Sequence, residues 1–147
     1  MSLLSPQSGE IPLPQPGPIS EPYWQGCREG VLRFQRCIDC RAATHTPALL
    51  CAACSSRSLE WVESSGNGEI YSWTRVWRPV TPAFVTPYVP IIVAMEEGWF
   101  ILSNLVGCED DAVAIGLRVE VVFHSSGGAD EIVLPYFQLV PYPSKSF

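Results

Sequence analysis

Charged side chains are scarce in this sequence of 147 residues. Asp, Glu, Lys and Arg make up 16% of it, whereas 47% of the residues are hydrophobic. An average soluble domain has about 25% charged residues. A chain that stays disordered needs the opposite balance, few hydrophobic residues and a high charge, so the composition excludes a disordered protein. The length fits about one domain and is sufficient to bury a core without disulfides.

Segments that direct a protein to a membrane are also missing. No hydrophobic run approaches the roughly 18 residues that cross a bilayer. The first residues lack the basic segment followed by an apolar stretch that marks secretion. We therefore expect a cytoplasmic protein without a membrane-spanning helix.

Basic residues are few and almost all of one kind. Eight Arg and a single Lys, Lys145, stand against 15 acidic residues, which gives a net charge of −6. Proteins that bind DNA or RNA regardless of sequence usually present a basic patch, because much of their affinity comes from displacing counterions from phosphates. The charge therefore argues against general nucleic-acid binding.

Signatures of catalysis are absent as well. The sequence contains no G-x-S-x-G, no Walker motif, no dinucleotide-binding fingerprint and no H-E-x-x-H. Its acidic clusters, Glu96-Glu97 and Glu109-Asp110-Asp111, lie in predicted turns, where solvated charge is the ordinary role. We expect no active site of the chain's own.

Proline is abundant where the chain begins. Six of the first 22 residues are Pro. Since proline fixes φ and lacks an amide donor, this stretch cannot form a helix or an interior strand. We expect residues 1–19 to form an extended arm that is disordered alone or lies along a partner. Ser20 is the expected N-cap of a helix over about 21–29, which Gly30 ends, within a short helical segment of 20–34.

Strand patterns dominate from Gly66 onward. Turn residues separate five runs rich in β-branched and aromatic residues, at 69–77, 91–95, 99–106, 118–124 and 131–140. Residues 78–90 carry four prolines and predict a stiff loop between the first two runs. Five such strands suit a small closed barrel of the OB type over residues 65–141, because closure removes exposed edges. A five-stranded open meander is the alternative, and residues 142–147 are the expected tail.

Four of the six cysteines form the motif Cys37-x2-Cys40-x10-Cys51-x2-Cys54. Each C-x2-C turn places two thiolates on one side of a tight loop, and two such loops facing each other provide a tetrahedral cage for Zn²⁺. Two disulfides are disfavoured in a chain without a secretory signal, and a thioredoxin-like redox site does not explain two matched pairs. The sequence therefore predicts a zinc ribbon over residues 35–64, with iron in a rubredoxin-like site of the same four ligands as the alternative.

The predicted metal is structural. All four ligands come from the protein, so no coordination position is left for a substrate. The ten-residue spacing between the pairs is short, and Arg41 stands where many such loops have glycine. His45 lies inside the ribbon, but four cysteines already complete the ligand set. Cys27 and Cys108 are expected to be buried free thiols.

Several separate segments form a specific combination. They are the aromatic pair Tyr23-Trp24, the run 30–37, the two cysteine pairs and the turn Ser65-Gly66-Asn67-Gly68 that leads into the first barrel strand. Further along are Pro87-Tyr88-Val89-Pro90, Asn104-Leu105-Val106, 115–119 and Pro135-Tyr136-Phe137. Together they resemble the family of zinc-ribbon/OB-fold proteins associated with acyl-CoA metabolism, over roughly residues 20–140.

The resemblance implies a fold and a role. Family members have an N-terminal helical part, a rubredoxin-like zinc ribbon and an OB barrel. They act as small partners of thiolase-superfamily enzymes: thiolases, acyltransferases and the retro-aldolases of steroid side-chain degradation. The large partner supplies the catalytic residues, and the small one bridges subunits and helps to hold the CoA thioester. The resemblance thus implies a mainly β, non-catalytic subunit of steroid or fatty-acyl metabolism, with a MaoC-like hydratase as a second candidate partner.

The resemblance also suggests residues for contact with the partner or the ligand. They are Trp24, Trp73, Arg75, Trp77, Arg78 and Phe84. The two arginines suit the phosphates of CoA, and the aromatic residues from Trp73 onward suit stacking on adenine. Trp24 is one large aromatic more than a short helix needs for its own packing, which indicates docking. The alternative role for Trp73 is in the barrel core.

Two other classes of function stay open. OB barrels also occur in nucleic-acid-binding modules, against which the net charge argues. A free-standing enzyme acting on acyl-CoA is the third hypothesis, and activity without any partner would identify it.

Overall fold

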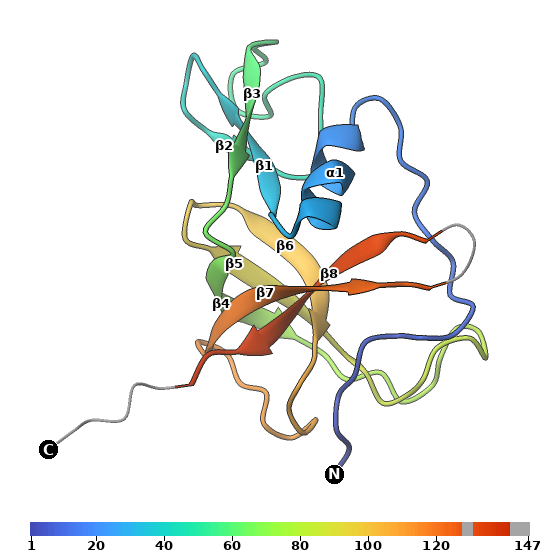
Figure 1. Ribbon diagram of the computed structural model, residues 1–147. Helices are drawn as coiled ribbons and strands as arrows, with labels where there is room; N and C mark the ends of the chain where they lie inside the picture. The colour runs from blue at the N-terminus through green and yellow to red at the C-terminus, as the bar shows by residue number, and fades with distance from the viewer. Residues whose placement is uncertain (128–130, 142–147) are drawn as a thin grey trace, which may run out of the picture.

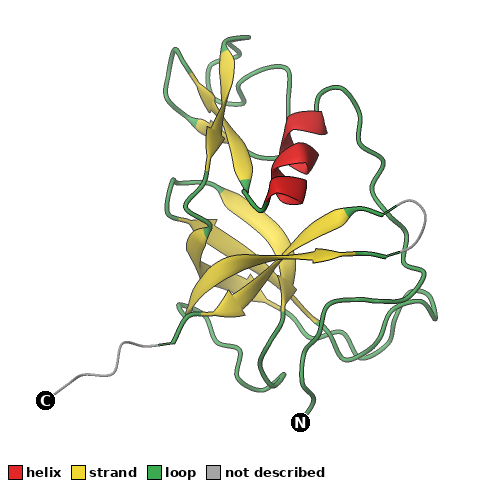
Figure 2. Cartoon of the chain, in the orientation of Figure 1, coloured by secondary structure: helices red, strands yellow, loops and turns green. Residues whose placement is uncertain are grey.

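The computed structural model describes residues 1–127 and 131–141 and shows one short helix, a small sheet and a closed barrel (Figures 1 and 2). The elements are α1 (Glu21–Glu29), β1 (Arg33–Cys37), β2 (Ala43–Thr44), β3 (Leu59–Glu63), β4 (Asn67–Trp73), β5 (Val89–Met95), β6 (Phe100–Leu105), β7 (Arg118–Ser125) and β8 (Val133–Leu139). The predicted fold class, mainly β with an N-terminal helix and a five-stranded barrel, is confirmed. Within the described residues, no helix has the length and hydrophobicity that a membrane crossing requires.

The helix α1 begins and ends where the sequence predicts. Gly30 ends it with a left-handed φ of 77°, a conformation that glycine adopts without steric cost. Ser20 is the N-cap by position only, because its hydroxyl bonds the backbone of Gly17 and not the helix amides. Tyr23 and Cys27 are buried on one face, and α1 contacts both β1 and β8.

The ribbon segment forms a three-stranded antiparallel sheet in the order β2-β1-β3. Phe34 on the central strand β1 is fully buried, and its ring stacks on that of Trp99 with 5.2 Å between the centroids. Trp99 lies in the turn between the barrel strands β5 and β6. The ribbon and the barrel therefore share one hydrophobic core.

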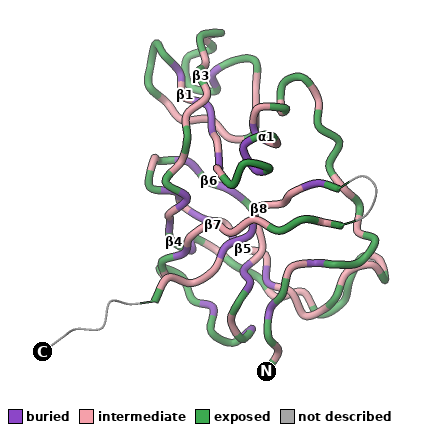
Figure 3. The backbone as a smooth tube through the Cα atoms, viewed as in Figure 1, coloured by how far each residue is buried: buried purple, intermediate pink, exposed green. Residues whose placement is uncertain are grey.

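Strands β4 to β8 close a barrel in the order β4-β5-β6-β8-β7, with β7 paired to β4. Neighbouring strands are antiparallel except β6 and β8, which run parallel and share a single bridge between Leu105 and Phe137. This closure excludes the open meander. Buried residues recur along the barrel strands (Figure 3). On β5 every second side chain is buried: Val89, Ile91, Val93 and Met95.

Each of the five predicted strands differs in its bounds from the observed one, and the largest difference is at the end of β4. β4 ends at Trp73, before the predicted end, because the chain leaves the barrel there. An isolated bridge between Val76 and Tyr88 then closes the base of the proline loop. β8 begins at Val133, later than predicted. Residues Glu109-Asp110-Asp111 form the predicted turn.

The proline-rich arm runs along one side of the barrel, from the N-terminus to α1 (Figure 1). Leu4 is part of the shared core, and its N–H donates to the carbonyl of Cys108 at 2.8 Å. The buried side chain of Gln7 donates to the carbonyl of Val85 at 3.0 Å and accepts the N–H of Val85 at 2.8 Å. The arm is thus packed on its own barrel, where the sequence predicted disorder or a partner.

Candidate metal centre and ligand surface

The two C-x2-C loops, here called knuckles, face each other at the end of the ribbon sheet where β1 finishes. The sulfur atoms of Cys37, Cys40, Cys51 and Cys54 all lie within 4.8 Å of one another. Two separations, Cys37 to Cys54 and Cys40 to Cys51, are 3.6 Å. A tetrahedron with Zn–S bonds of about 2.3 Å places its sulfurs about 3.8 Å apart, whereas a disulfide bond is about 2.05 Å long. The geometry fits a four-thiolate zinc site and not two disulfides.

The two knuckles share one backbone geometry. The N–H of Arg41 donates to the carbonyl of Cys37 at 3.0 Å, and the N–H of Ser55 donates to that of Cys51 at 2.9 Å. Arg41 and Ser55 both adopt left-handed backbone conformations, with φ of 65° and 63°. Arg41 therefore replaces the glycine of common knuckles without changing their conformation.

Backbone amides in the knuckles point at the sulfur atoms. The N–H of Cys40 lies 3.5 Å from the sulfur of Cys37, and the N–H of Ala53 lies 3.4 Å from that of Cys51. The amide of Cys40 lowers the pKa of Cys37 to about 7, and the amide of Cys54 lowers the pKa of Cys51. Because metals bind the thiolate form, these amides favour metal binding.

His45 packs away from the sulfur cluster. Its ring lies between those of Tyr23 and Trp99, with 5.4 and 5.0 Å between the ring centroids. Burial lowers the pKa of His45 to about 4, so the imidazole is neutral at pH 7. It joins α1, the ribbon and the barrel, and it takes no part in the cluster of possible metal ligands.

The two remaining cysteines lie apart from the knuckles. Cys27 is on the buried face of α1, as predicted, and burial raises the pKa of its thiol to about 12. Cys108 is half-buried rather than fully buried, and desolvation raises the pKa of its thiol as well. Raised pKa values leave both thiols protonated and unreactive near pH 7.

Arg75 is held between two tryptophan rings. Its guanidinium carbon lies 5.7 Å from the ring centroid of Trp73 and 5.4 Å from that of Trp77. Its Nε lies 3.1 Å from a carboxylate oxygen of Asp110, and its Nη2 donates to the carbonyl of Asp110 at 2.6 Å. The N–H of Ser2 also donates to this buried carboxylate, at 2.7 Å, and lowers its pKa. The guanidinium predicted to meet CoA phosphates is thus already bound within the chain.

The structure brings two other predicted residues together. Trp24 on α1 and Phe84 in the proline loop line one hollow of about 620 Å³, between the arm, α1 and strands β6 and β8. Tyr136 and Asn104 contribute to the same hollow. Arg78, by contrast, is exposed on the proline loop.

Two residues that hold Arg75 and the proline loop in place could not be identified from the sequence. Asp110 was expected to be a solvated turn residue, but it is buried and binds Arg75 and Ser2. Gln7 ties the arm to Val85 of the proline loop. Neither contact has a signal in the sequence, because each joins segments far apart along the chain.

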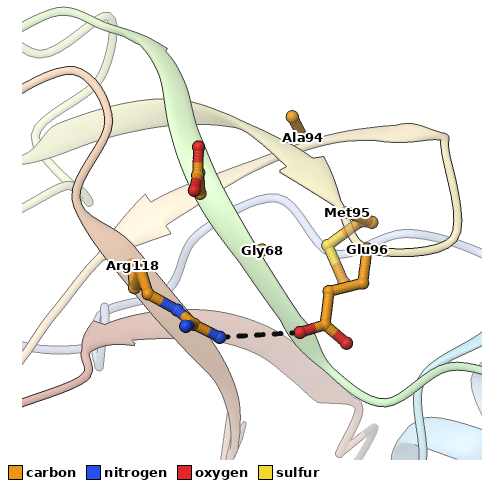
Figure 4. A pocket seen from close by; sticks show the side chains of 6 residues that line it. Gly68, Ala94, Met95, Glu96 and Arg118 are labelled. Carbon is orange, nitrogen blue, oxygen red and sulfur yellow. Dashed lines mark ion pairs between the residues drawn. The ribbon is translucent and has the colours of Figure 1, made fainter.

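A shallow pocket of about 360 Å³ lies where β4 passes the end of β5 (Figure 4). The side chains of Arg118 and Glu96 point toward each other there, with 3.7 Å between nitrogen and oxygen. A Cβ on Gly68 would lie 2.6 Å from the carbonyl oxygen of Ala94, so only glycine fits this position. The pocket contains none of the predicted ligand residues.

Two family models match the chain in succession. The model described as the rubredoxin-like zinc ribbon domain of ChsH2 matches residues 24–60, and the model of the C-terminal OB-fold domain of ChsH2 matches residues 61–124. The first match contains all four cysteines of the sulfur cluster, which supports structural zinc.

Curated relatives include enzyme subunits and scaffold proteins. A probable enoyl-CoA hydratase alpha subunit of Thermomonospora curvata is 34% identical over 116 residues, which cover 79% of this chain and 36% of the relative. A DUF35 domain-containing scaffold protein of Methanothermobacter thermautotrophicus is 32% identical over 115 residues, 75% of this chain and 86% of the relative. The 3-oxo-4,17-pregnadiene-20-carboxyl-CoA hydratase alpha subunit of Mycobacterium tuberculosis is 32% identical over 101 residues, 69% and 32% of the two chains. The chain therefore spans only about a third of the two hydratase subunits.

Solved structures show the same architecture. A chain of the Ltp2-ChsH2(DUF35) aldolase superimposes with a TM-score of 0.77 and 31% identity, covering 86% of this chain and 98% of that chain. A DUF35 protein of unknown function from Sulfolobus solfataricus superimposes with a TM-score of 0.57 over 72% of this chain and 78% of that chain. At 16% identity, the second likeness shows the fold alone.

Proposed function

Because this chain belongs to the DUF35 family and combines a ChsH2-type zinc ribbon with a ChsH2-type OB barrel, we propose that it is a non-catalytic accessory subunit of a thiolase-type enzyme. In this role it binds a thiolase, acyltransferase or retro-aldolase and helps to hold the CoA thioester on which that enzyme acts. The thioester belongs to steroid side-chain or fatty-acyl metabolism.

The observation that carries the proposal is the extent of one structural match. The chain aligns with 98% of a chain of the Ltp2-ChsH2(DUF35) aldolase at 31% identity. The aligned 86% of this chain is far longer than the barrel by itself, whereas an OB barrel alone serves many unrelated functions. The name of that structure describes an aldolase that has a DUF35 part.

The chemistry of the described residues favours an accessory role over catalysis. Asp110 is the single buried acidic residue among them, and Arg75 and the amide of Ser2 already bind it. His45 is half-buried between aromatic rings. The sulfur cluster has four protein ligands and leaves no position for a substrate. We therefore assign the reacting groups to the partner enzyme.

Zinc, when bound, would cross-link the two knuckles and so hold the ribbon in its folded form.

The residues of this chain that would meet the CoA thioester are those of the proline loop. Arg78 is exposed and suits a phosphate, and the neighbouring ring of Trp77, 62% exposed, suits stacking on adenine. Arg75 then acts by holding the two tryptophans in place.

Co-expression tests the proposed function directly. The chain, carrying an affinity tag, would be produced together with a thiolase-type enzyme from the same genome, and the purified material would be analysed for both subunits and for acyl-CoA turnover. We expect a stable complex whose activity needs both chains. Retention of no such enzyme, or turnover of thioesters by this chain alone, would contradict the proposal.

A hydratase is the second candidate partner, because two relatives are named as alpha subunits of CoA-ester hydratases. In those proteins the region similar to this chain occupies about a third of the length. A MaoC-like hydratase that co-purifies in place of the thiolase-type enzyme would favour this alternative.

A further inference from the structure

An exposed apolar patch covers the outer side of strands β4, β5 and β6. It consists of Tyr71, Ile92, Ala94, Phe100 and Leu102, which we name the outer apolar face. Three of these side chains are largely open to solvent: Tyr71 is 60% exposed, Phe100 52% and Leu102 72%. Single exposed apolar residues are ordinary on protein surfaces, whereas a contiguous group marks a site of contact.

The strand register makes this patch contiguous. Ile92 lies opposite Leu102, and Ala94 lies opposite Phe100, on neighbouring strands β5 and β6. The rings of Tyr71 and Phe100 meet edge to face with 5.0 Å between their centroids. They do so across β5, which runs between their strands, because the small side chain of Ala94 leaves space between them. The face is therefore a continuous apolar surface over β5 and β6, which the ring of Tyr71 extends onto β4 between Glu69 and Ser72.

The position of this face within the barrel indicates a binding role. β5 and β6 are the second and third strands of the barrel, and OB folds commonly bind their ligands on this pair. Neither strand contains Lys or Arg. Nucleic-acid binding depends on cations that displace counterions from phosphates, so the aromatic rings here lack the charge that such a ligand needs. An aromatic patch depleted of charge is typical instead of the centre of a protein–protein interface.

The edge of the face near the β5–β6 turn is acidic. Glu69 and Glu96 are exposed there, and Arg118, 3.7 Å from Glu96, is the basic residue in the pocket that they line (Figure 4). A second copy of the chain would carry the same acidic edge and a net charge of −6, and like charges oppose association. The charges fit an apolar patch that has basic residues along its edge.

We propose that the outer apolar face docks on the thiolase-type enzyme, against an apolar patch edged by basic residues. This inference rests on the proposed function and adds the surface through which the two proteins meet. Phe100 and Leu102 on β6 lie beside the central strand β5 and have the most exposed apolar surface on these two strands, so they would lose the most contact with water on docking. Central residues that lose all contact with water usually carry most of the energy of an interface.

A charge placed on this face tests the docking. Leu102→Asp puts a carboxylate at a position that is 72% exposed in the free chain, and Leu49→Asp makes the same change on the ribbon at a position 69% exposed. Affinity for the co-expressed enzyme would be measured by surface plasmon resonance, with thermal melts of each variant to verify folding. We expect Leu102→Asp to weaken binding roughly thirty-fold or more and Leu49→Asp to leave it unchanged.

Each other outcome contradicts a different statement. If Leu102→Asp binds the enzyme as tightly as the wild-type chain, the face is not the docking surface, and the proposed function stands. If the wild-type chain binds no thiolase-type enzyme, both fail. A wild-type dimer that Leu102→Asp converts to monomer in light scattering would make a second copy the occupant. If the wild-type chain binds a single-stranded oligonucleotide tightly and Phe100→Asp does not, the face binds a nucleic acid and not a protein.

Discussion

Two residues of the zinc ribbon adopt a conformation that glycine usually provides. Arg41 and Ser55 follow the second cysteine of their knuckles with φ of 65° and 63°. A left-handed backbone costs an L-residue roughly 1–2 kcal/mol, because Cβ approaches the next carbonyl oxygen. The ribbon tolerates this cost at both places, which is consistent with stabilisation of the knuckles by a bound metal.

Glycine at position 55 is therefore expected to stabilise the chain. Ser55→Gly removes the Cβ, and the greater freedom of glycine in the unfolded state offsets part of the gain. We expect the free energy of unfolding to rise by up to about 1 kcal/mol, as measured by urea denaturation of the zinc-loaded protein. Ser55→Ala is the matched control, since alanine keeps the Cβ, and an equal gain in this variant would refute the explanation.

His45 makes stability depend on pH in a defined window. Its pKa is lowered by burial from 6.5 to about 4, so below pH 6.5 the unfolded chain takes up a proton that the folded chain does not. The free energy of unfolding therefore falls as the pH drops from about 6.5 to about 4, by up to about 3 kcal/mol, and this contribution changes no further at lower pH.

Comparison with His45→Phe isolates this contribution. Phenylalanine keeps an aromatic ring between Tyr23 and Trp99 but does not titrate. We expect the variant to lose less stability than the wild type over the same pH range, with loss of metal common to both. An unchanged pH dependence in His45→Phe would contradict the assignment.

Among the elements, the N-terminal arm organises the proline loop. Gln7 forms two hydrogen bonds with the backbone of Val85, and Leu4 inserts into the core. Arm and loop are far apart in sequence, so the loop that carries Trp77 and Arg78 owes its conformation to a segment that sequence patterns alone describe as an extended tail.

Removal of the Gln7 side chain should loosen that loop. In Gln7→Ala the N–H of Val85 loses its acceptor, and since Val85 is 65% exposed, water can replace it. We expect a loss of about 1–2 kcal/mol of stability and faster hydrogen exchange at the Val85 amide. Gln15→Ala changes an exposed glutamine of the same arm; if both variants exchange alike, Gln7 does not position the loop.

At the scale of the whole molecule, ribbon and barrel are joined by one core, in which Phe34 stacks on Trp99. Metal bound by the knuckles should therefore stabilise the barrel as well as the ribbon. We expect a chelator to lower the midpoint of a single thermal transition by well over 10 °C, because structural zinc contributes on the order of 10 kcal/mol. If calorimetry shows that the chelator removes a transition of the ribbon and leaves a transition of the barrel unchanged, the ribbon and the barrel unfold independently, and the expectation is wrong.

Local patterns in the sequence predict most of this architecture. Alternation along Ile91–Met95 predicts a barrel strand, the spacing of the cysteines predicts the sulfur cluster, and Gly30 predicts the end of α1. Contacts between distant segments could not be predicted, because nothing near Asp110 signals a carboxylate buried under Arg75. For the same reason the candidate ligand residues were predicted singly, whereas their grouping, Trp24 with Phe84 and Arg75 between two tryptophans, comes only from the fold.

The barrel has one weak seam. Antiparallel neighbours are joined by ladders of several pairs, but β6 and β8 share the single bridge of Leu105 and Phe137, one backbone hydrogen bond from the N–H of Val106 to the carbonyl of Phe137, and one from the hydroxyl of Ser103 to the carbonyl of Pro135. Breathing of the barrel should begin at this bridge. When β6 and β8 separate, the barrel becomes an open curved sheet in which all the antiparallel strand pairs remain formed. The opened form therefore stays close to the native one, and the barrel closes again quickly.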